Sequence, residues 1–339
     1  MKILVTGGAG FIGSHLCEKL LSLGHSIINV DNFHNFYSKD IKINNVLEST
    51  NNIDYINKIK EIKELTKIVN SNNYKLYFND IRDFQSLDNI FYSEKPEFII
   101  NLAGLAGVRP SIETPLIYEE VNIKGSMNLL ELCKKYKISK FIQASSSSVY
   151  GNNIKVPFEE TDTVDNAISP YAFTKKACEV MGHVYHKLYN INMFQLRFFT
   201  VYGERQRPDL AIHKFINLIS KDKEIEIFGD GSTYRDYTYI HDIIYGILKS
   251  IDYLNSHNNI YEILNLGSSK PISLKEMLMT IEKVLNKKAK VKYLPMQAGD
   301  VDKTYANINK ASTLIGYKPS ITFEEGIKNF VKWYKGGLV

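Results

Sequence analysis

KILVTGGAGFIG, residues 2 to 13, is the stretch that decides the fold of this chain. Residues 3 to 5 form a short apolar run, the glycines follow it, and residues 14 to 23 have the pattern of a helix. Glycines let the backbone approach a pyrophosphate at a helix N-terminus, where free N–H groups and the helix dipole attract anions. The stretch therefore predicts a strand, a turn and a helix that bind a dinucleotide.

A second strand is predicted over residues 27 to 30, and it ends at Asp31. A carboxylate there accepts hydrogen bonds from the adenosine ribose and repels a 2′-phosphate, so we predict NAD rather than NADP. Asp80, at the end of the third strand, is expected to reach the adenine amino group. The predicted cofactor-binding residues are Gly7, Gly10, Phe11, Ile12, Gly13, Asp31, Asn32, Asp80, Ile81, Leu102, Ala103 and Gly104, together with Tyr171 and Lys175.

SPYAFTKK, residues 169 to 176, predicts a helix start that carries a phenol and an ammonium on one face. Ser169 suits the N-cap and Pro170 the first helical position, so Tyr171 and Lys175 lie one turn apart. An ammonium and the positive end of a helix both favour a phenolate. The pair is therefore a candidate base, although an isolated pair of this spacing is common on protein surfaces.

Strands alternate with helices through residue 200, which predicts a doubly wound parallel sheet of the Rossmann type. From Tyr202 onward, loops rich in Arg, Pro, Gly and Asp indicate a smaller α/β substrate lobe, interwoven with the first. We expect residues 1–198 with 236–268 to form the NAD-binding domain, and 199–235 with 269–339 to form the nucleotide-sugar lobe. Helices are expected near 116–135 and 171–189, and the serines at 145 to 148 should meet substrate at a strand end.

The composition is that of an ordinary globular protein: 339 residues, 44% hydrophobic, with a formal net charge of +5. Lys and Arg are scattered among Asp and Glu, so neither nucleic acid nor a membrane is an expected partner. The cysteines at 17, 133 and 178 are expected to be reduced. No apolar signal segment is visible, which leaves the cytoplasm as the expected location.

Four motifs together resemble an extended short-chain dehydrogenase/reductase that acts on nucleotide sugars. They are TGGAGFIG at 6–13, SVYG at 148–151, SPYAFTKKA at 169–177 and RDYTYIHD at 235–242. RFFTVYG at 197–203, RQRPDLA at 205–211 and MQAGDV at 296–301 look most like UDP-glucuronate 4-epimerases. The resemblance covers nearly the whole chain.

The resemblance implies a role for each matching residue. Tyr171 would be the general base, Lys175 would favour its phenolate and hold the nicotinamide ribose, and Ser146 would bond the sugar 4-hydroxyl. For the rest of the substrate, Arg235 would grip the UDP diphosphate, while Phe228 and Asp300 would line the uridine pocket. The relatives are usually homodimers joined through helices that correspond to 116–135 and 171–189.

The reaction is inferred from what stands beside Ser146. Dehydratases of this superfamily place Asp-Glu there because elimination of water needs its own acid and base, and decarboxylating relatives carry Glu at the second position. This chain has Ser147 and Ser148. The remaining chemistry is 4-epimerisation of a UDP-sugar through a transient 4-keto intermediate.

The substrate is inferred from Thr200 and Arg207. Many relatives that act on neutral UDP-hexoses have Asn in place of Thr200, whereas a C6 carboxylate is suited by hydroxyl donors and a cation, here Ser147, Ser148, Thr200 and Arg207. UDP-glucuronate is therefore the predicted substrate and UDP-galacturonate the product. UDP-glucose or UDP-N-acetylglucosamine 4-epimerisation is the alternative, and a non-catalytic NAD-binding regulator is a remote one. Arg205 and Gln206 have no assigned role, and no metal is expected.

Overall fold

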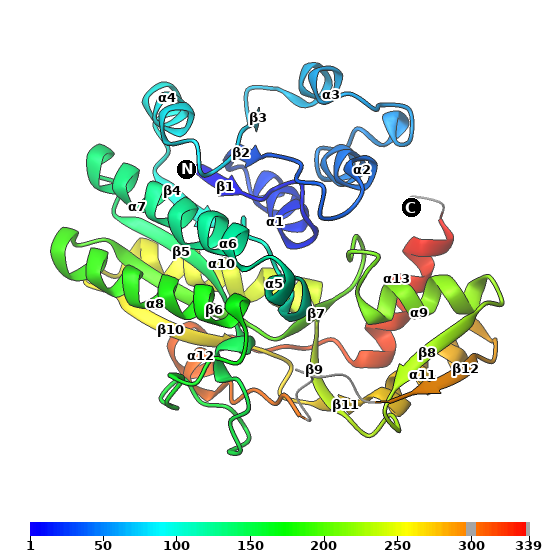
Figure 1. Cartoon of the computed structure of the whole chain (residues 1–339). Coiled ribbons are helices and arrows are strands. Elements are labelled where there is room, and N and C mark those ends of the chain that lie inside the picture. Colours follow the sequence, from blue (N-terminus) through cyan, green and yellow to red (C-terminus); the bar gives the residue numbers. More distant parts are fainter. Residues whose placement is uncertain (296–302, 337–339) are drawn as a thin grey trace.

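The structure is a computed structural model that describes residues 1–295 and 303–336 (Figure 1). Within these residues the main sheet has seven strands, and every bonded pair is parallel. In spatial order they are β10 (Tyr261–Leu266), β6 (Asn192–Phe198), β5 (Lys140–Ser146), β4 (Phe98–Asn101), β1 (Lys2–Thr6), β2 (Ser26–Asp31) and β3 (Tyr74–Phe78). The strand order reverses between β1 and β4. This is the predicted doubly wound sheet, in which ligands bind beyond the carboxyl ends of the strands at the reversal.

The strands beside the reversal are buried on both faces. Ile3, Leu4 and Val5 of β1 are fully buried. Ile3 and Val5 belong to one apolar cluster and Leu4 to another, because successive side chains of a strand point to opposite faces. Burial on both faces explains the unbroken apolar run in the sequence, and each such side chain stabilises the fold by roughly 1.5–3 kcal/mol.

Helices cover both faces of the main sheet, and shorter helical turns lie in the connecting loops. They are α1 (Phe11–Ser22), α2 (Lys39–Ser49), η1 (Ile53–Tyr55), α3 (Ile62–Val69), α4 (Phe84–Glu94), α5 (Val108–Glu113), α6 (Pro115–Tyr118), η2 (Glu119–Lys124), α7 (Gly125–Tyr136), η3 (Ser147–Tyr150), α8 (Pro170–Tyr189) and α10 (Ile240–Ser256). α1, α2 and α10 share a cluster with Ile3, whereas α4, α7 and α8 share one with Leu4. Figure 1 shows α7 and α8 side by side, on the sheet face to which Leu4 belongs. No helix in the described part of the chain has the length and apolar content needed to span a bilayer.

The helix predicted over residues 116 to 135 is not uniform. α6 passes into the π-helical turns of η2 before α7 continues the same path. Asn122 lies in η2, and its amide bonds the N–H and C=O of Leu105 and the hydroxyl of Thr174. The wider turns thus bring a buried amide between the loop after β4 and α8, a use that π-helical turns often have near functional sites.

A smaller group of elements follows β6. Within the described residues, β7 (Thr200–Tyr202), β9 (Tyr234–Tyr239) and β11 (Pro271–Ser273) form a three-stranded sheet, and β8 (Glu224–Phe228) pairs with β12 (Lys290–Leu294). The helices are α9 (Ala211–Ser220), α11 (Leu274–Leu285), α12 (Asn309–Ile315) and α13 (Phe323–Lys335). Figure 1 shows β8, β11, β12, α9 and α11 together to one side of the main sheet. β7 begins directly after Phe199, so the chain passes from the main sheet into the small one without a linker.

Candidate functional site

A cavity of about 420 Å³ opens beyond the carboxyl ends of β1, β2, β4 and β5, and we call it the sheet cavity. Its wall includes every residue predicted to bind the cofactor: Gly7, Gly10, Phe11, Ile12, Gly13, Asp31, Asn32, Asp80, Ile81, Leu102, Ala103, Gly104, Tyr171 and Lys175. These residues come from positions up to 168 residues apart in the sequence (175 minus 7). Their convergence follows from the reversal of strand order.

The glycine turn between β1 and α1 is closely packed. A Cβ on Gly13 would lie 2.1 Å from the carbonyl oxygen of Gly7, a distance that no side chain can occupy. Gly7 has φ +72°, and a Cβ there would lie 2.9 Å from the nitrogen of Ala103. The turn therefore needs glycine, and it places the uncapped start of α1, residues 10 to 13, on the wall of the cavity, where free N–H groups suit an anion.

Asp31 ends β2 and lies buried in the wall of the sheet cavity. Its carboxylate accepts hydrogen bonds from the N–H groups of Ala9 (3.0 Å) and Phe33 (2.7 Å). Burial raises the pKa of the Asp31 carboxyl, and the ammonium of Lys42 opposes this rise. Lys42 comes from α2 and lines the same cavity. Sequence reasoning missed Lys42, because residues 36 to 75 show few strong patterns; its place between Ile41 and Ile43 was the available signal.

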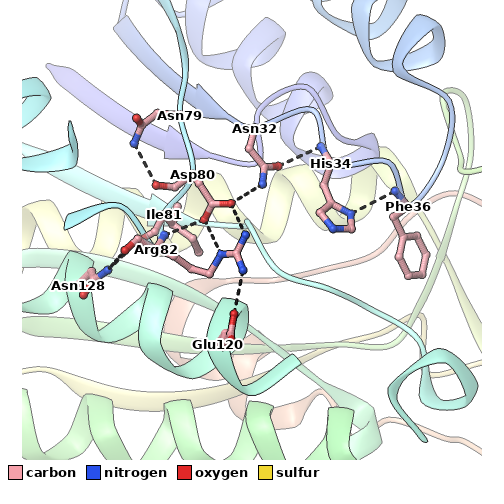
Figure 2. A network of polar contacts seen from close by, with 9 residues as sticks. All are labelled: Asn32, His34, Phe36, Asn79, Asp80, Ile81, Arg82, Glu120 and Asn128. Carbon is pink, nitrogen blue, oxygen red and sulfur yellow. Dashed lines mark hydrogen bonds and ion pairs between the residues drawn. The ribbon is translucent and has the colours of Figure 1, made fainter. Parts of the chain in front are cut away.

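Asp80 is the centre of the polar network drawn in Figure 2. Its Oδ1 accepts from the backbone N–H (2.8 Å) and Nε (3.0 Å) of Arg82, and its Oδ2 accepts from Arg82 Nη2 (2.9 Å) and Asn32 Nδ2 (2.8 Å). Burial opposes the charge, but the hydrogen bonds from Arg82 outweigh it and lower the pKa of the Asp80 carboxyl. Each oxygen already accepts two bonds, so Asp80 fixes this wall. Its predicted contact with the adenine amino group stays a prediction.

Tyr171, Lys175 and Ser146 meet on the wall of the sheet cavity. α8 starts as predicted, since Ser169 Oγ accepts the N–H of Ala172 (3.1 Å). Lys175 Nζ donates to the carbonyl of Ala144 (2.8 Å) and lies 5.9 Å from the centre of the Tyr171 ring. Ser146 ends β5 and caps η3. The start of α8 thus holds the phenol of Tyr171 and the ammonium of Lys175 beside the end of β5, which carries the hydroxyl of Ser146.

Ser145, the first of the four serines, lies inside β5 and has a structural partner. Ser145 is buried, and its hydroxyl donates to Glu179 Oε1 (2.7 Å). Glu179 also receives two hydrogen bonds from Arg197, Nε to Oε1 at 2.8 Å and Nη2 to Oε2 at 2.9 Å. Ser145 is therefore committed to a buried ion pair that fastens α8 to β5 and β6. Ser145 also lines the sheet cavity, so the expectation that the serines from 145 to 148 meet substrate stays a prediction.

A second cavity, of about 520 Å³, is lined by the small sheet and its neighbours, and we call it the lobe cavity. Its wall includes the following predicted substrate residues: Ser147, Ser148, Thr200, Arg207, Phe228 and Arg235. Asp300 and the rest of the 296–301 motif fall in the segment 296–302, outside the described residues. Ser148, Thr200 and Arg207 line both cavities, so the two cavities adjoin at these residues.

The loop before α9 carries three residues with different tasks. Arg205 is buried with φ +59°, and its guanidinium bonds Glu48 (Nε to Oε2, 2.7 Å) and Glu18. Gln206 is buried and donates to the carbonyl of Val201 (3.0 Å). These two residues, unassigned from the sequence, tie the loop to α1, α2 and β7. Arg207 faces the cavities instead.

Arg235 is followed in β9 by Asp236, whose side chain is buried. The Asp236 carboxylate is fully buried and accepts the N–H groups of Ser268 (2.7 Å), Ser269 (3.0 Å) and Ala306 (3.1 Å). Burial raises the pKa of this carboxyl, and the hydrogen bonds oppose the rise. Asp236 therefore joins β9 to two distant loops at the edge of the lobe cavity, a role that the sequence motif alone did not reveal.

The walls of the sheet cavity fit an adenine dinucleotide. The glycine turn presents α1 N–H groups where a pyrophosphate would lie, Asp31 lies at the end of β2 where a ribose diol would lie, and Tyr171 and Lys175 lie at the opposite end. The buried carboxylate of Asp31 disfavours a 2′-phosphate at that point. The residues present thus suit NAD.

Comparisons with known proteins agree with this arrangement. The model of the family described as GDP-mannose 4,6-dehydratase matches residues 4–330. UDP-glucuronate 4-epimerase of Thermodesulfobacterium geofontis is 42% identical over 336 residues, which cover 99% of this chain and 96% of that protein. UDP-glucuronic acid 4-epimerase from Bacillus cereus, solved with UDP-glucuronic acid and NAD, has a TM-score of 0.86 at 34% identity, with 99% of each chain covered. UDP-glucose 4-epimerase of Thermotoga maritima, solved with UDP-glucose, has a TM-score of 0.84 at 30% identity, with 100% of each chain covered.

Proposed function

The chain belongs to the GDP-mannose 4,6-dehydratase family, and we propose that it is an NAD-dependent 4-epimerase that converts UDP-glucuronate to UDP-galacturonate. The relatives named above, which are UDP-sugar 4-epimerases, support the reaction class. Dehydration needs an acid and a base of its own beside the catalytic hydroxyl. Here Ser147 and Ser148 stand at those positions, so the chain lacks what a dehydratase requires.

The observation that carries the proposal is the junction of the two cavities. Ser146, Tyr171 and Lys175 lie on the sheet cavity, next to the residues that line both cavities. A UDP-sugar with its nucleotide in the lobe cavity would present its sugar at this junction. The sugar would then lie between the phenol of Tyr171 and the nicotinamide end of the sheet cavity.

Each of the three residues has a definite task at the sugar. NAD supplies a reversible two-electron oxidation at C4, with no net change over a full turnover. Tyr171, as phenolate, takes the proton of the 4-hydroxyl and returns it after the ketone has presented its other face. Ser146 holds the same oxygen by a hydrogen bond, and Lys175 stabilises the phenolate by its charge.

The substrate assignment depends on the residues shared by the cavities. Thr200 and Ser148 of this shared set, with Ser147 of the lobe cavity, offer hydroxyl donors, and Arg207 offers a cation. Together they suit the C6 carboxylate of a uronate. Fixing that carboxylate also matters chemically, because a 4-keto uronate is a β-keto acid that loses CO2 readily. The T. geofontis and B. cereus relatives support a uronate, whereas the T. maritima relative marks the neutral alternative.

The test is to incubate the purified protein separately with UDP-glucuronate, UDP-glucose and UDP-N-acetylglucosamine, without added reductant. The anomeric proton of each sugar is followed by NMR. We expect UDP-galacturonate from the first and no turnover of the other two. Turnover confined to neutral sugars would transfer the assignment to the alternative substrates, and no turnover of any sugar would reject the epimerase.

We further propose that the protein is a homodimer joined through α8 and the helical stretch formed by α6, η2 and α7. The support is an exposed apolar stripe on α8: Phe173, Val180, Val184 and Leu188 are 54%, 55%, 45% and 64% exposed. Apolar residues at this spacing share one helix face. We expect Leu188→Asp with Val180→Asp to convert a dimer to a monomer in analytical ultracentrifugation. Met279→Asp, on the exposed side of α11, is the control; a monomeric parent protein would contradict the proposal.

The division into domains and the location are also proposals. The main sheet supports a cofactor domain that holds residues 1–198 and β10, since β10 pairs with β6, and the small sheets support a lobe that holds β7, β8, β11 and β12. The proposed boundary between residues 235 and 236 falls inside β9, whose residues 236–239 pair with β7 and β11 of the small sheet. Cys17, Cys133 and Cys178 are buried and free, which suits a reducing compartment such as the cytoplasm.

A further inference from the structure

Phe36 lies at the junction of the two cavities and lines both of them. The centre of its ring is 4.7 Å from Cζ of Arg207. Phe36 belongs to the loop between β2 and α2, on the cofactor side, whereas Arg207 belongs to the loop before α9. This contact therefore joins the loop on the cofactor side of the sheet cavity to Arg207, a residue of the proposed substrate site.

The position of Phe36 is set from the cofactor side. Asn32 Oδ1 accepts the N–H of His34 (3.0 Å), and the N–H of Phe36 bonds His34 Nδ1 (3.2 Å). Asn32 Nδ2 in turn donates to Asp80 Oδ2 (2.8 Å). Figure 2 shows these contacts as one series from Asp80 to Phe36. The carbonyl of His34 also receives Lys42 Nζ (2.6 Å), so the loop is fastened to two residues of the sheet cavity.

The guanidinium of Arg207 is held on one face and one edge. Phe36 lies against its face, and Asp209 takes its edge through Nε to Oδ1 (3.0 Å) and Nη2 to Oδ2 (2.8 Å). A guanidinium is planar and its N–H groups radiate in a fixed fan, so fixing the face fixes the direction of every donor. Phe36 thus sets the plane in which Arg207 can meet an anion.

We propose that Phe36 is a positioning residue that orients Arg207 toward the C6 carboxylate of the substrate, and so raises selectivity for acidic over neutral UDP-sugars. This inference rests on the proposed function, because it takes the uronate as the ligand of Arg207. Phe36 itself needs no contact with the sugar. The loop between β2 and α2, which lines the sheet cavity, therefore contributes to the choice of substrate.

The experiment compares Phe36→Leu, which keeps apolar volume but removes the ring face, with Phe36→Tyr, which keeps the face. Dissociation constants for UDP, UDP-glucose and UDP-glucuronate are measured by calorimetry, and bound NAD is quantified in each preparation. We expect Phe36→Leu to weaken UDP-glucuronate binding by about tenfold, the size of a partly buried cation–π contact. Binding of UDP and UDP-glucose and the NAD content should stay within about twofold, and Phe36→Tyr should restore binding of the uronate.

Two further arms make the result specific. In Arg207→Met, the added Phe36→Leu change should cause no further loss, because the two residues act through one contact. Phe84→Leu, at the start of α4, is the matched control. The inference is overturned if Phe36→Leu leaves uronate binding unchanged, weakens all three ligands equally, or acts through loss of NAD. Selective binding of the uronate without epimerisation would reject the proposed reaction and leave the role of Phe36 standing.

Discussion

The sheet cavity and the lobe cavity are built in different ways. The sheet cavity is shaped mainly by backbone: a glycine turn, strand ends and the N-terminus of α1, each formed by a short local stretch that the parallel sheet brings beside the others. The lobe cavity is held by side chains that join distant segments, such as Asp236, which bonds residues 268 and 306. A single methyl group added at a glycine of the turn should therefore damage the sheet cavity. Loss of the single charge of Asp236 should damage the lobe cavity.

The largest effect is expected for Tyr171, on the wall of the sheet cavity beside the junction of the two cavities. Tyr171→Phe removes the proton carrier and keeps the ring that packs against Tyr118. Epimerisation should fall by roughly 10²–10⁴-fold, whereas bound NAD and UDP affinity should stay near those of the parent protein. Turnover is measured by NMR and bound NAD by release and absorbance. Loss of NAD in this variant would mean that Tyr171 belongs to the binding walls rather than to the chemistry.

The backbone-built cavity is tested by a graded pair of substitutions. The Cβ of Gly13→Ala would lie 2.1 Å from Gly7 O, and that of Gly10→Ala 3.1 Å from the same atom. We expect Gly13→Ala to lower NAD affinity by about 100-fold, or to prevent folding, and Gly10→Ala to lower it by several-fold. Fluorescence titration with NAD and thermal melting measure the two effects. Equal NAD affinity in both variants would show that crowding at Gly7 does not shape the site.

The side-chain-built cavity is tested by Asp236→Asn. An amide must turn an NH2 group toward backbone donors, which leaves buried N–H groups without an acceptor and costs roughly 1–3 kcal/mol. UDP affinity should fall by about tenfold with NAD content unchanged.

Asp242→Asn is the matched control for Asp236→Asn. Asp242 is also buried, and it accepts two backbone N–H groups, those of Ser320 (3.0 Å) and Ile321 (3.2 Å), where Asp236 accepts three. It lies on α10, and neither it nor its chain neighbours line a cavity described here, whereas Arg235 and Tyr237 on either side of Asp236 line the lobe cavity. We expect it to lower the melting temperature without changing UDP affinity, measured by calorimetry. Similar UDP affinities in the two variants would remove Asp236 from the substrate site.

The smallest effect is expected for Lys42→Met. The charge of Lys42 opposes the rise in the pKa of Asp31 that burial causes, and so favours the carboxylate. Loss of that charge should lower NAD affinity by roughly three- to tenfold. Lys39→Met, on the same helix and paired with Glu61 at 3.7 Å, should leave NAD affinity unchanged. A larger loss than that of Gly13→Ala would contradict a cavity shaped mainly by backbone.

Much of the sheet cavity could be predicted from the sequence because its parts are local. The turn after β1, Asp31 at the end of β2 and the capped start of α8 each follow from short motifs, and parallel strands bring their ends together. Lys42, Asn122 and Phe36 could not be found in this way. Each acts through a partner far away in the sequence, and its own neighbours carry no sign of that partner.

The sequence by itself determined the doubly wound sheet, the glycine turn, Asp31 and the position of Tyr171 and Lys175 on one helix face, because these depend on local periodicity and backbone conformation. The tertiary structure decided that Ser145 serves a buried ion pair, that Arg205 and Gln206 brace a loop, and that Arg207 rests on Phe36. The physical reason is that a polar side chain is assigned its task by whichever donor, acceptor or ring the fold brings within a few ångströms of it.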